Sequence, residues 1–429
     1  MQTVATPLVN PLAGPAQRHA AARAKVFALP IEQVDPSDPR LFEDGIARHY
    51  FERLRQDDPV HFTQNELFGK FWSVTRYQDI MEVDTHHGVY SSDWTQGGIT
   101  IFDRPIDARL QMFIAMDQPK HDEQRKTVSP IVAPGNLANM EATIRARTCA
   151  VLDGLPRNQT FNWVEKVSVE LTTQMLATLF DFPFQDRHLL TWWSDVATSV
   201  PEVDGKVPSA EARLVELGKM LAYFTKLWNE RINAPPATDL ISMLAHGPST
   251  RGMTPIEFMG NLVLLIVGGN DTTRNSMTGG LLALCERPDQ FNKLRANPAL
   301  LDSLVPEIIR WQTPLSHMRR TALSDTELGG KQIKKGDKVI MWYASGNRDA
   351  SAIDNPDEFI IDRARPRQHL SFGFGIHRCV GNRLAELQLM ILWDEILQRF
   401  PVIELVGEPV RVRSNFVHGF SELNVRLPG

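Results

Sequence analysis

The stretch "HLSFGFGIHRCVGNRLAEL", residues 369–387, holds one of only three cysteines in a chain of 429 residues. Glycines precede Cys379, and glycine lets a backbone approach a flat ligand closely. A helix is predicted to begin near Val380, and the positive end of its dipole favours a thiolate at Cys379. A thiolate there can be a nucleophile, a metal ligand or a redox sensor, whereas an isolated cysteine usually serves as a small buried apolar residue.

Composition argues against several classes of function. The formal net charge is −5, so the chain lacks the basic excess of a nucleic-acid-binding protein. Cys149, Cys285 and Cys379 are odd in number and far apart, which disfavours a disulfide scaffold or a structural zinc site. The most apolar run, residues 261–269, is too short for a membrane span of about 20 residues. We therefore expect a cytoplasmic protein with no membrane anchor and no nucleic-acid partner.

Helical periodicity dominates the chain and favours a mainly α fold with small sheets. Hairpins are predicted over residues 59–77 and 327–343. Helices are predicted over residues 135–155, 164–180, 210–232, 254–286, 301–312 and 380–400. Because no internal repeat or linker follows the Ala/Pro-rich start, we expect a flexible segment over residues 1–40 and a single large domain over residues 41–429.

The predicted helix over residues 254–286 has an unusual middle. It starts with a capping box, "TPIE" at residues 254–257, but its interior reads "GGNDTTRN" at residues 268–275. Two glycines cost about 1 kcal/mol each in a helix interior, and buried polar groups cost more unless they are paired. Either Thr272 bonds back to the carbonyl of Gly268 and merely bends the helix, or this part of the helix has a function.

Residues 372–379, Phe-Gly-x-Gly-x-His-x-Cys, resemble the haem-binding signature of cytochrome P450, the haem-thiolate monooxygenases. The resemblance implies the P450 fold, a triangular prism with small β-sheets and a long central helix over the haem. It also implies that Cys379 is the axial ligand of the iron of haem b, and that Phe372 and Gly373 lie against the porphyrin. A thiolate axial ligand favours O–O cleavage of dioxygen, the co-substrate of this family.

The long helix carries a second match. Its Gly-Gly-Asn-Asp-Thr-Thr sequence, residues 268–273, resembles the oxygen-activation motif of the family. The resemblance implies that Asp271 and Thr272 relay protons to dioxygen through water. Such a relay meets a chemical need, because O–O cleavage requires protons inside an apolar pocket.

A third match lies in "EIIRWQTP". An acid–base pair three residues apart, such as Glu307 and Arg310, is by default a surface pair worth a few tenths of a kcal/mol. Here it resembles the buried Glu-x-x-Arg pair of the P450 family, with Arg363 as the implied third member. The implied role of these three residues is structural.

The fourth match concerns the two haem propionates, which need cationic or donor partners when they are enclosed. "MDQPKHDEQRK" places His121 and Arg125 on one helical face. With Arg320 and His377 they resemble the propionate partners of the family, and Arg319 could take the role of Arg320.

Five stretches resemble one bacterial branch, the soluble alkane terminal hydroxylases: "FIAMDQPKHD", "LLIVGGNDTTRNSM", "EIIRWQTPL", "MWYASGNRD" and "GNRLAELQL". This resemblance implies hydroxylation of the terminal carbon of medium-chain alkanes or the ω-carbon of fatty acids. It implies electrons from a [2Fe-2S] ferredoxin, reduced by an NAD(P)H-dependent reductase, and we expect a monomer. The alternative is a P450 hydroxylase of another small apolar substrate, such as a terpenoid or a steroid.

The substrate pocket is expected to be apolar, as an alkyl chain requires. Its candidate residues are Ile99, Ile101, Phe102, Leu264, Leu265, Val267, Gly268, Leu315, Met318, Phe416, Val417 and Phe420. Two polar exceptions could meet a fatty-acid head group or point away, namely His317 and His418. Three cations are expected to face an acidic ferredoxin: Lys126, Arg378 and Arg383.

Three other functions remain open at the level of sequence. A hydrolase using Cys379 and His377 lacks an evident third orienting group. A haem sensor or electron carrier would not need Asp271 and Thr272, and a peroxide-driven enzyme would not be expected to keep them.

Overall fold

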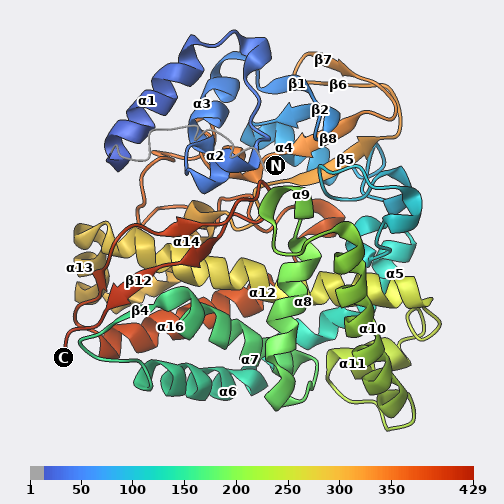
Figure 1. The fold of residues 1–429 in the computed structure, drawn as a ribbon, viewed down its shortest axis with the longest axis vertical. Helices are drawn as coiled ribbons and strands as arrows, with labels where there is room; N and C mark the ends of the chain where they lie inside the picture. The colour runs from blue at the N-terminus through green and yellow to red at the C-terminus, as the bar shows by residue number, and fades with distance from the viewer. Residues whose placement is uncertain (1–13) are drawn as a thin grey trace.

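Helix α12 (Pro255–Cys285) runs through the middle of the molecule in the computed structural model, which describes residues 14–429 (Figure 1). Its start is the predicted capping box: the Thr254 side chain accepts from the Glu257 backbone, and the Glu257 side chain accepts from the Thr254 backbone at 3.0 Å. The prediction of a mainly helical fold with small sheets and a long central helix is confirmed.

Fifteen further α-helices are described: α1 (Pro15–Ala28), α2 (Pro39–Glu43), α3 (Ala47–Asp57), α4 (Tyr77–Thr85), α5 (Lys120–Val128), α6 (Pro134–Asp153), α7 (Glu170–Leu179), α8 (His188–Thr198), α9 (Pro201–Asp204), α10 (Ala210–Ile232), α11 (Leu240–His246), α13 (Pro288–Ala296), α14 (Leu301–Gln312), α15 (Tyr343–Gly346) and α16 (Asn382–Arg399). The predictions over residues 210–232 and 301–312 match α10 and α14 at both ends. The helix predicted from Val380 begins two residues later, and a π-turn over Val164–Val169 precedes α7. The described helices outside the predicted ranges are α1, α2, α3, α4, α5, α8, α9, α11, α13 and α15.

The strands are β1 (Val60–Asn65), β2 (Gly69–Val74), β3 (Tyr90–Ser91), β4 (Thr160–Asn162), β5 (Met318–Ala322), β6 (Thr326–Leu328), β7 (Lys331–Ile333), β8 (Lys338–Met341), β9 (Glu404–Leu405), β10 (Val410–Arg411), β11 (Phe420–Glu422) and β12 (Asn424–Arg426). The largest sheet has the order β1-β2-β8-β5-β3, with β2 and β8 parallel. The hairpin predicted over residues 59–77 is β1–β2. The one predicted over residues 327–343 is correct only for β6–β7, because β8 joins the larger sheet.

The N-terminal segment differs from its prediction. Residues 1–13 of the segment expected to be flexible lie outside the described residues, whereas α1 follows directly with a proline in its first turn. Helix α1 packs on α3 and buries Ala22 and Val26. Alanine has the highest helix propensity, so the Ala-rich composition of this segment also suits a helix.

Two large apolar clusters meet along α12. The half of α12 before Gly268 contributes to a cluster with α7, α8, α10 and α11, whereas the half after Asn275 packs with α14 and α16. The polar stretch between these halves, residues 268–275, contributes no side chain to either cluster.

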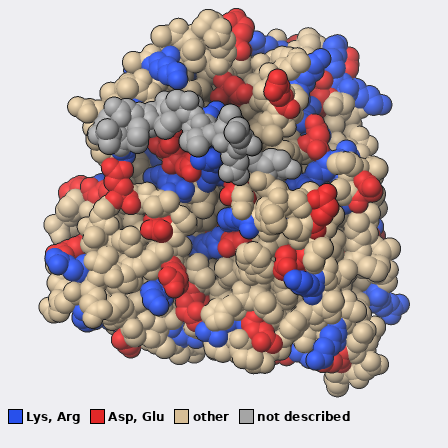
Figure 2. Space-filling view, in the orientation of Figure 1, with Lys and Arg blue, Asp and Glu red and all other residues tan. Residues whose placement is uncertain are grey.

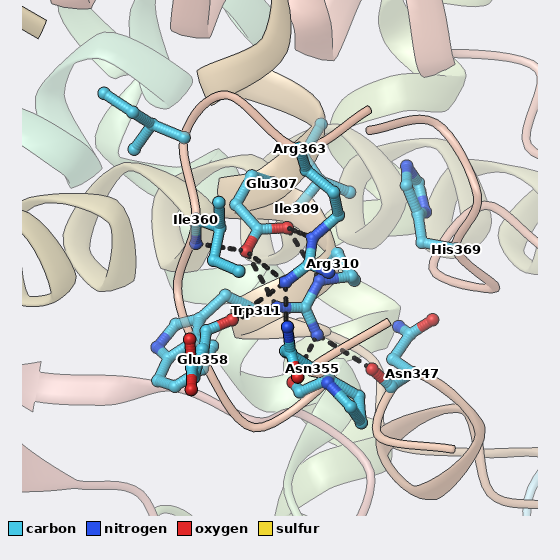
Figure 3. Close-up of polar contacts among 12 residues, drawn as sticks. Glu307, Ile309, Arg310, Trp311, Asn347, Asn355, Glu358, Ile360, Arg363 and His369 are labelled. Atoms are coloured by element: carbon cyan, nitrogen blue, oxygen red, sulfur yellow. Dashed lines mark hydrogen bonds and ion pairs between the residues drawn. The ribbon is translucent and has the colours of Figure 1, made fainter. Parts of the chain in front are cut away.

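A buried ion cluster fixes the chain ahead of the cysteine loop (Figure 3). Glu307 accepts from Arg310 at 2.7 and 2.8 Å and from Arg363 at 3.1 Å. Arg310 also donates to the Asn347 carbonyl at 2.9 Å, and the Asn347 side chain accepts from the Leu370 N–H at 2.6 Å. These contacts connect α14 to the start of the loop that carries Cys379. The three side chains implied as a structural set therefore do lie together.

The visible surface carries basic and acidic side chains interspersed over the described residues (Figure 2). None of the described helices is long and apolar enough to cross a membrane.

Candidate active site

A cavity of about 360 Å³ lies between the middle of α12 and the cysteine loop. Gly268 and Thr272 line it from α12, and Cys379 lines it from the loop. Most of the other lining side chains are apolar. A cavity of this size, closed by apolar groups and a few polar ones, is typical of a ligand site.

The cysteine loop is held by its own backbone. The Cys379 N–H donates to the Phe372 carbonyl at 2.8 Å, so the loop closes on itself just before α16. Gly373 and Gly375 both have φ of +63°, a conformation that strains other residues. At Gly375 a side chain would also place its Cβ 2.5 Å from the Asp84 carbonyl oxygen. The glycines of the motif are therefore needed for the turn itself.

Cys379 faces the cavity while protein surrounds it on its other sides. Burial raises the pKa of its thiol, although the backbone N–H groups of Gly381 and Asn382 act in the opposite direction. The nearby guanidinium groups of Arg125 and Arg378 also favour the thiolate. A metal bound to the sulfur would remove the proton outright. The expectation of a thiolate at the start of α16 thus depends on coordination as well as on the helix.

Two histidines present unpaired buried nitrogens at this cavity. The rings of His121 and His377 lie 4.4 Å apart in an edge-to-face arrangement. His121 Nδ1 bonds to Asp122 at 2.7 Å, and His377 Nε2 bonds to the Ser92 hydroxyl at 2.8 Å. The other nitrogen of each ring, His121 Nε2 and His377 Nδ1, has no partner among the described residues. Both rings line the cavity, so these nitrogens are free for a ligand.

Two arginines complete this end of the cavity. Arg125 lines it and donates to the Arg378 carbonyl. Arg320 also lines it, and its charge is balanced by Asp84 at 2.8 Å. Arg319 points to the other face of strand β5 and pairs with Asp103 at 2.7 Å. Because side chains alternate along a strand, Arg319 cannot take the role of Arg320.

These residues fit a flat iron group that carries two carboxylates. Cys379 would bind the iron, and Phe372 and Gly373, which also line the cavity, would lie against the ring. The cationic or donor partners for the carboxylates would be His121, Arg125, His377 and Arg320. The buried unpaired nitrogens are the observation that supports this fit, because a protein rarely leaves such groups without a partner.

Thr272 and Asp271 separate on α12. The Thr272 hydroxyl lines the cavity and donates to the Gly268 carbonyl at 2.9 Å. This is the back-bond considered from sequence, and α12 stays a continuous α-helix through it. The side chain of Asp271 is fully buried and lies away from the cavity, because successive helical residues point roughly 100° apart.

Asp271 belongs to a charged cluster between α8 and α12. Its carboxylate accepts from the Ser194 hydroxyl at 2.9 Å and pairs with Arg274 at 2.5 Å. The same Arg274 nitrogen contacts Asp195 at 2.7 Å, and Lys206 lies 3.5 Å from Asp195 toward the surface. Burial raises the pKa of Asp271, although Arg274 acts against this shift. The sequence did not predict this cluster. Its one local indication is the spacing of Asp271 and Arg274, which places the two side chains one turn apart on the helix.

The predicted pocket residues are almost all at the cavity. Those that line it are Ile99, Ile101, Phe102, Leu264, Leu265, Val267, Gly268, Leu315, Met318 and Phe416. Val417 does not line it: it pairs with Leu315 in a β-bridge, and adjacent residues of an extended chain face opposite sides. Phe420 also lies outside the lining and is buried in the cluster around α14 and α16.

The two polar exceptions are satisfied by backbone groups. His317 lines the cavity, but its Nδ1 donates to the Asn415 carbonyl at 2.9 Å and its Nε2 accepts from the Ile101 N–H at 3.3 Å. His418 donates to the Gln312 carbonyl at 2.7 Å. Burial lowers the pKa of both His317 and His418 to about 4, so both are neutral at pH 7. Neither is placed to meet an anionic head group.

One wall of the cavity is tied to the large sheet. Lys338 donates to the Ile101 carbonyl at 2.9 Å and to Asp103 at 2.6 Å. Arg319 donates to Asp103 from the neighbouring strand, and its backbone N–H donates to the Ile99 carbonyl at 2.8 Å. Ile101 is thereby held by the buried Lys338 ammonium group and Ile99 by a backbone hydrogen bond from β5, rather than by packing alone.

The three cations expected to face a ferredoxin are exposed. Arg378 and Arg383 lie on either side of Cys379, and Lys126 lies on α5. The described chain therefore presents positive charge close to the cysteine loop.

Comparison with known proteins identifies the family to which this chain is related. The family model described as Cytochrome P450 matches residues 225–420. Linalool 8-monooxygenase of Pseudomonas putida is 36% identical over 408 residues, which cover 92% of this chain and 99% of that protein. Steroid C26-monooxygenase of Rhodococcus jostii is 31% identical, with coverage of 92% and 84%.

A solved structure agrees with these relatives. Cytochrome P450-153 from Novosphingobium aromaticivorans is 48% identical, with a TM-score of 0.86 and coverage of 92% of this chain and 99% of that one. Members of this family are haem-dependent monooxygenases, and the cavity contains groups suited to haem. The chain belongs to the cytochrome P450 family.

Proposed function

We propose that this protein is a terminal hydroxylase, which inserts one atom of dioxygen into the terminal C–H bond of medium-chain alkanes or at the ω-carbon of fatty acids. The observation that carries the proposal is the apolar cavity that extends from Cys379 between α12 and the wall at Ile99 and Ile101. The resemblance of five stretches to bacterial alkane hydroxylases supports it. We place the enzyme in the cytoplasm as a monomer.

Cys379 holds the haem iron in this proposal, and bound haem supplies the activation of dioxygen and the oxidation of the C–H bond. His121, Arg125 and His377 hold the haem carboxylates, with Arg320 kept in place by Asp84. Glu307 and its two arginine partners act at a distance, because they hold the segment before the loop.

Protons reach the cavity through α12. Thr272 offers its hydroxyl at the cavity, where the oxygen can pass a proton to or from water. Asp271 keeps a raised pKa on the far side of the helix, so its carboxyl can take up a proton from the α8 side. Transfer to Thr272 requires the Asp271 side chain to leave Arg274, since the side chains of Asp271 and Thr272 point roughly 100° apart on α12.

Terminal selectivity is a problem of shape, since a methyl C–H bond is stronger than a methylene C–H bond. The cavity must therefore present only the end of a chain to the reacting centre. Leu264 and Val267 on α12 face the same space as the wall residues Ile99 and Ile101. Apolar groups on both sides exclude water and align an unbranched chain.

Electrons are supplied by a [2Fe-2S] ferredoxin and its NAD(P)H-dependent reductase. Arg378, Arg383 and Lys126 form the proposed docking face, because positive charge attracts an acidic partner.

A substrate panel tests the proposal. Purified holoenzyme would be supplied with ferredoxin, reductase and NAD(P)H, and given octane, dodecanoic acid, linalool or a steroid. We expect turnover with octane or dodecanoic acid to exceed that with linalool and the steroid. The reverse order would favour the alternative of a terpenoid or steroid hydroxylase, to which the relatives named linalool 8-monooxygenase and steroid C26-monooxygenase point. A reduced, CO-bound spectrum without the thiolate signature would contradict the role of Cys379.

A further inference from the structure

A buried arginine lies at the α8–α10 side of the cavity. Arg213 stands in the first turn of α10, is 6% exposed and lines the cavity that contains Cys379. Helices α8 and α10 lie side by side here (Figure 1). Arg213 is not one of the haem-binding residues, and it has no role in the proposed oxidation or proton transfer.

Part of the Arg213 guanidinium has a structural task. Its Nε donates to the Val196 carbonyl at 3.1 Å and its Nη2 donates to the Ala197 carbonyl at 2.6 Å. These are among the last carbonyls of α8, which lack partners within the helix. Nη1 makes no hydrogen bond to any described protein group.

Arg213 has no direct ion-pair partner, although the charge of Asp204 acts to stabilise its cation. Among the described side chains none forms an ion pair with it. Asp204 lies nearby, but its oxygens accept from the Ser199 hydroxyl at 2.7 Å and from the Val200 N–H at 2.9 Å. The carboxylate of Asp204 is thus used to hold the turn after α8.

The guanidinium nevertheless stays charged. Burial lowers the pKa of Arg213 to about 10, and the nearby Arg104 adds to this shift. At neutral pH the side chain is still a cation. The end of α8 provides about half a negative charge and Asp204 attracts the cation without touching it, so the buried guanidinium still lacks a contacting anion.

An anion inside the cavity would complete this arrangement. Between Arg213 and the cysteine loop the lining is mostly apolar, with Leu110, Val263 and Leu264 among the contributing side chains. A molecule that suits both features has an unbranched apolar chain and one anionic end. A medium-chain fatty acid has this chemistry, whereas an alkane has no group for Arg213.

We propose that Arg213 binds the carboxylate of a medium-chain fatty acid and so directs its ω-end toward the cysteine loop. This inference rests on the proposed function and deepens it, because it names fatty acids as substrates that the cavity recognises by their head group. Arg213 is a specificity-determining residue in this account and takes no part in the chemistry.

The test compares two ligands of equal length that differ in charge. Binding of decanoate and of decan-1-ol to the holoenzyme would be measured by titration calorimetry, with no electron donor present. The variants are Arg213→Gln, which keeps a hydrogen-bond donor, and Arg213→Lys, which keeps the charge. Arg251→Gln, at an exposed position outside the cavity, is the control.

We expect Arg213→Gln to weaken the binding of decanoate about tenfold or more, as loss of a charged hydrogen bond implies. The affinity for decan-1-ol should change less than about twofold, and Arg213→Lys should recover part of the decanoate affinity. Equal losses for both ligands would show that Arg213 only caps α8 and would overturn the proposal. So would wild-type enzyme that fails to bind decanoate, or unchanged decanoate affinity in Arg213→Gln.

Failure of the proposed function gives a different result. Binding of decanoate that depends on Arg213, together with products hydroxylated away from the ω-carbon, would contradict terminal hydroxylation while leaving the head-group site intact.

Discussion

Asp271 and Thr272 are neighbours in sequence, yet they face different surroundings: Thr272 lines the cavity, whereas Asp271 is paired with Arg274 behind α12. The two halves of the implied proton relay are therefore separated by the helix itself. Their roles can be tested one at a time, because each side chain makes its own set of contacts.

Thr272→Ala should uncouple electron use from product formation. The variant loses the hydroxyl that bonds to the Gly268 carbonyl at the cavity. Product per NAD(P)H oxidised should fall about tenfold or more, since a positioned proton donor contributes roughly 10²–10⁴-fold. NAD(P)H oxidation itself should continue. Product and peroxide would be quantified together, with Thr278→Ala, a buried threonine of α12 outside the cavity, as the control. Full coupling in Thr272→Ala would argue against the relay.

Asp271→Asn should slow turnover rather than uncouple it. The amide keeps the shape of the side chain but cannot carry a proton, so kcat should fall by about 100-fold or more. A larger solvent isotope effect than in wild type would show that proton delivery limits the variant. Asp195→Asn removes the other acid that contacts Arg274 and should keep most activity. Equal losses in both variants would mean that the cluster serves only folding.

Glu307→Gln should destabilise the fold in a pH-dependent way. Burial alone would raise the pKa of Glu307, but hydrogen bonds from Arg310 and Arg363 lower it below its usual value. A lowered pKa means that this carboxylate stabilises the fold above its unfolded pKa, and that the stabilisation is lost as pH falls through the folded pKa.

At neutral pH Glu307→Gln should lose about 3–5 kcal/mol, the usual effect of breaking a buried ion pair. The difference from wild type should shrink under acid conditions. Denaturant unfolding of holoenzyme at several pH values measures both effects. Asp362→Asn breaks the half-exposed pair with Lys293 and should cost less than about 1 kcal/mol. A constant difference across pH would contradict the assigned charge of Glu307.

Lys338→Met should relax the position of oxidation. The lysine holds the wall that carries Ile101, and without it that wall is free to move away from the chain of the substrate. We expect a larger share of subterminal alcohols and a loss of stability of about 1–3 kcal/mol. Gas chromatography of the products gives the ratio. Lys334→Met removes an exposed lysine of the neighbouring turn and should leave the ratio unchanged.

Charge reversal at Arg378 and Arg383 should weaken the use of ferredoxin. KM for ferredoxin should rise about tenfold at low salt, and the dependence of the rate on salt should flatten. Arg365→Glu, an exposed control whose partner is Asp354, should have little effect. An unchanged salt dependence in the double variant would show that the partner docks elsewhere.

Much of this structure could be predicted from sequence where local patterns are strong. The capping box and helical periodicity predicted α12, and the glycines around Cys379 predicted the tight loop. The choice between Arg319 and Arg320 depends on which face of strand β5 is turned toward the cavity, and their adjacent positions in sequence do not reveal that face. The prediction that Val417 lines the pocket was wrong for the same reason, because a shift of one residue in an extended chain reverses the face of the side chain.

Long-range contacts left weaker signals. Ser194 on α8 reaches Asp271 from 77 residues away, and nothing in its sequence neighbourhood marks it. Arg213 resembles any solvated arginine of an amphipathic helix until the packing of α10 on α8 buries it. Such residues depend on how helices pack against each other, which periodicity alone does not determine.

The position of the hydroxyl group formed from octane tests terminal hydroxylation most directly. Holoenzyme with ferredoxin, its reductase and NAD(P)H would be incubated with octane, and the alcohols separated by gas chromatography. We expect octan-1-ol as the main product. Mainly octan-2-ol and octan-3-ol, or no oxidation of octane and dodecanoic acid under conditions where linalool is consumed, would contradict terminal hydroxylation.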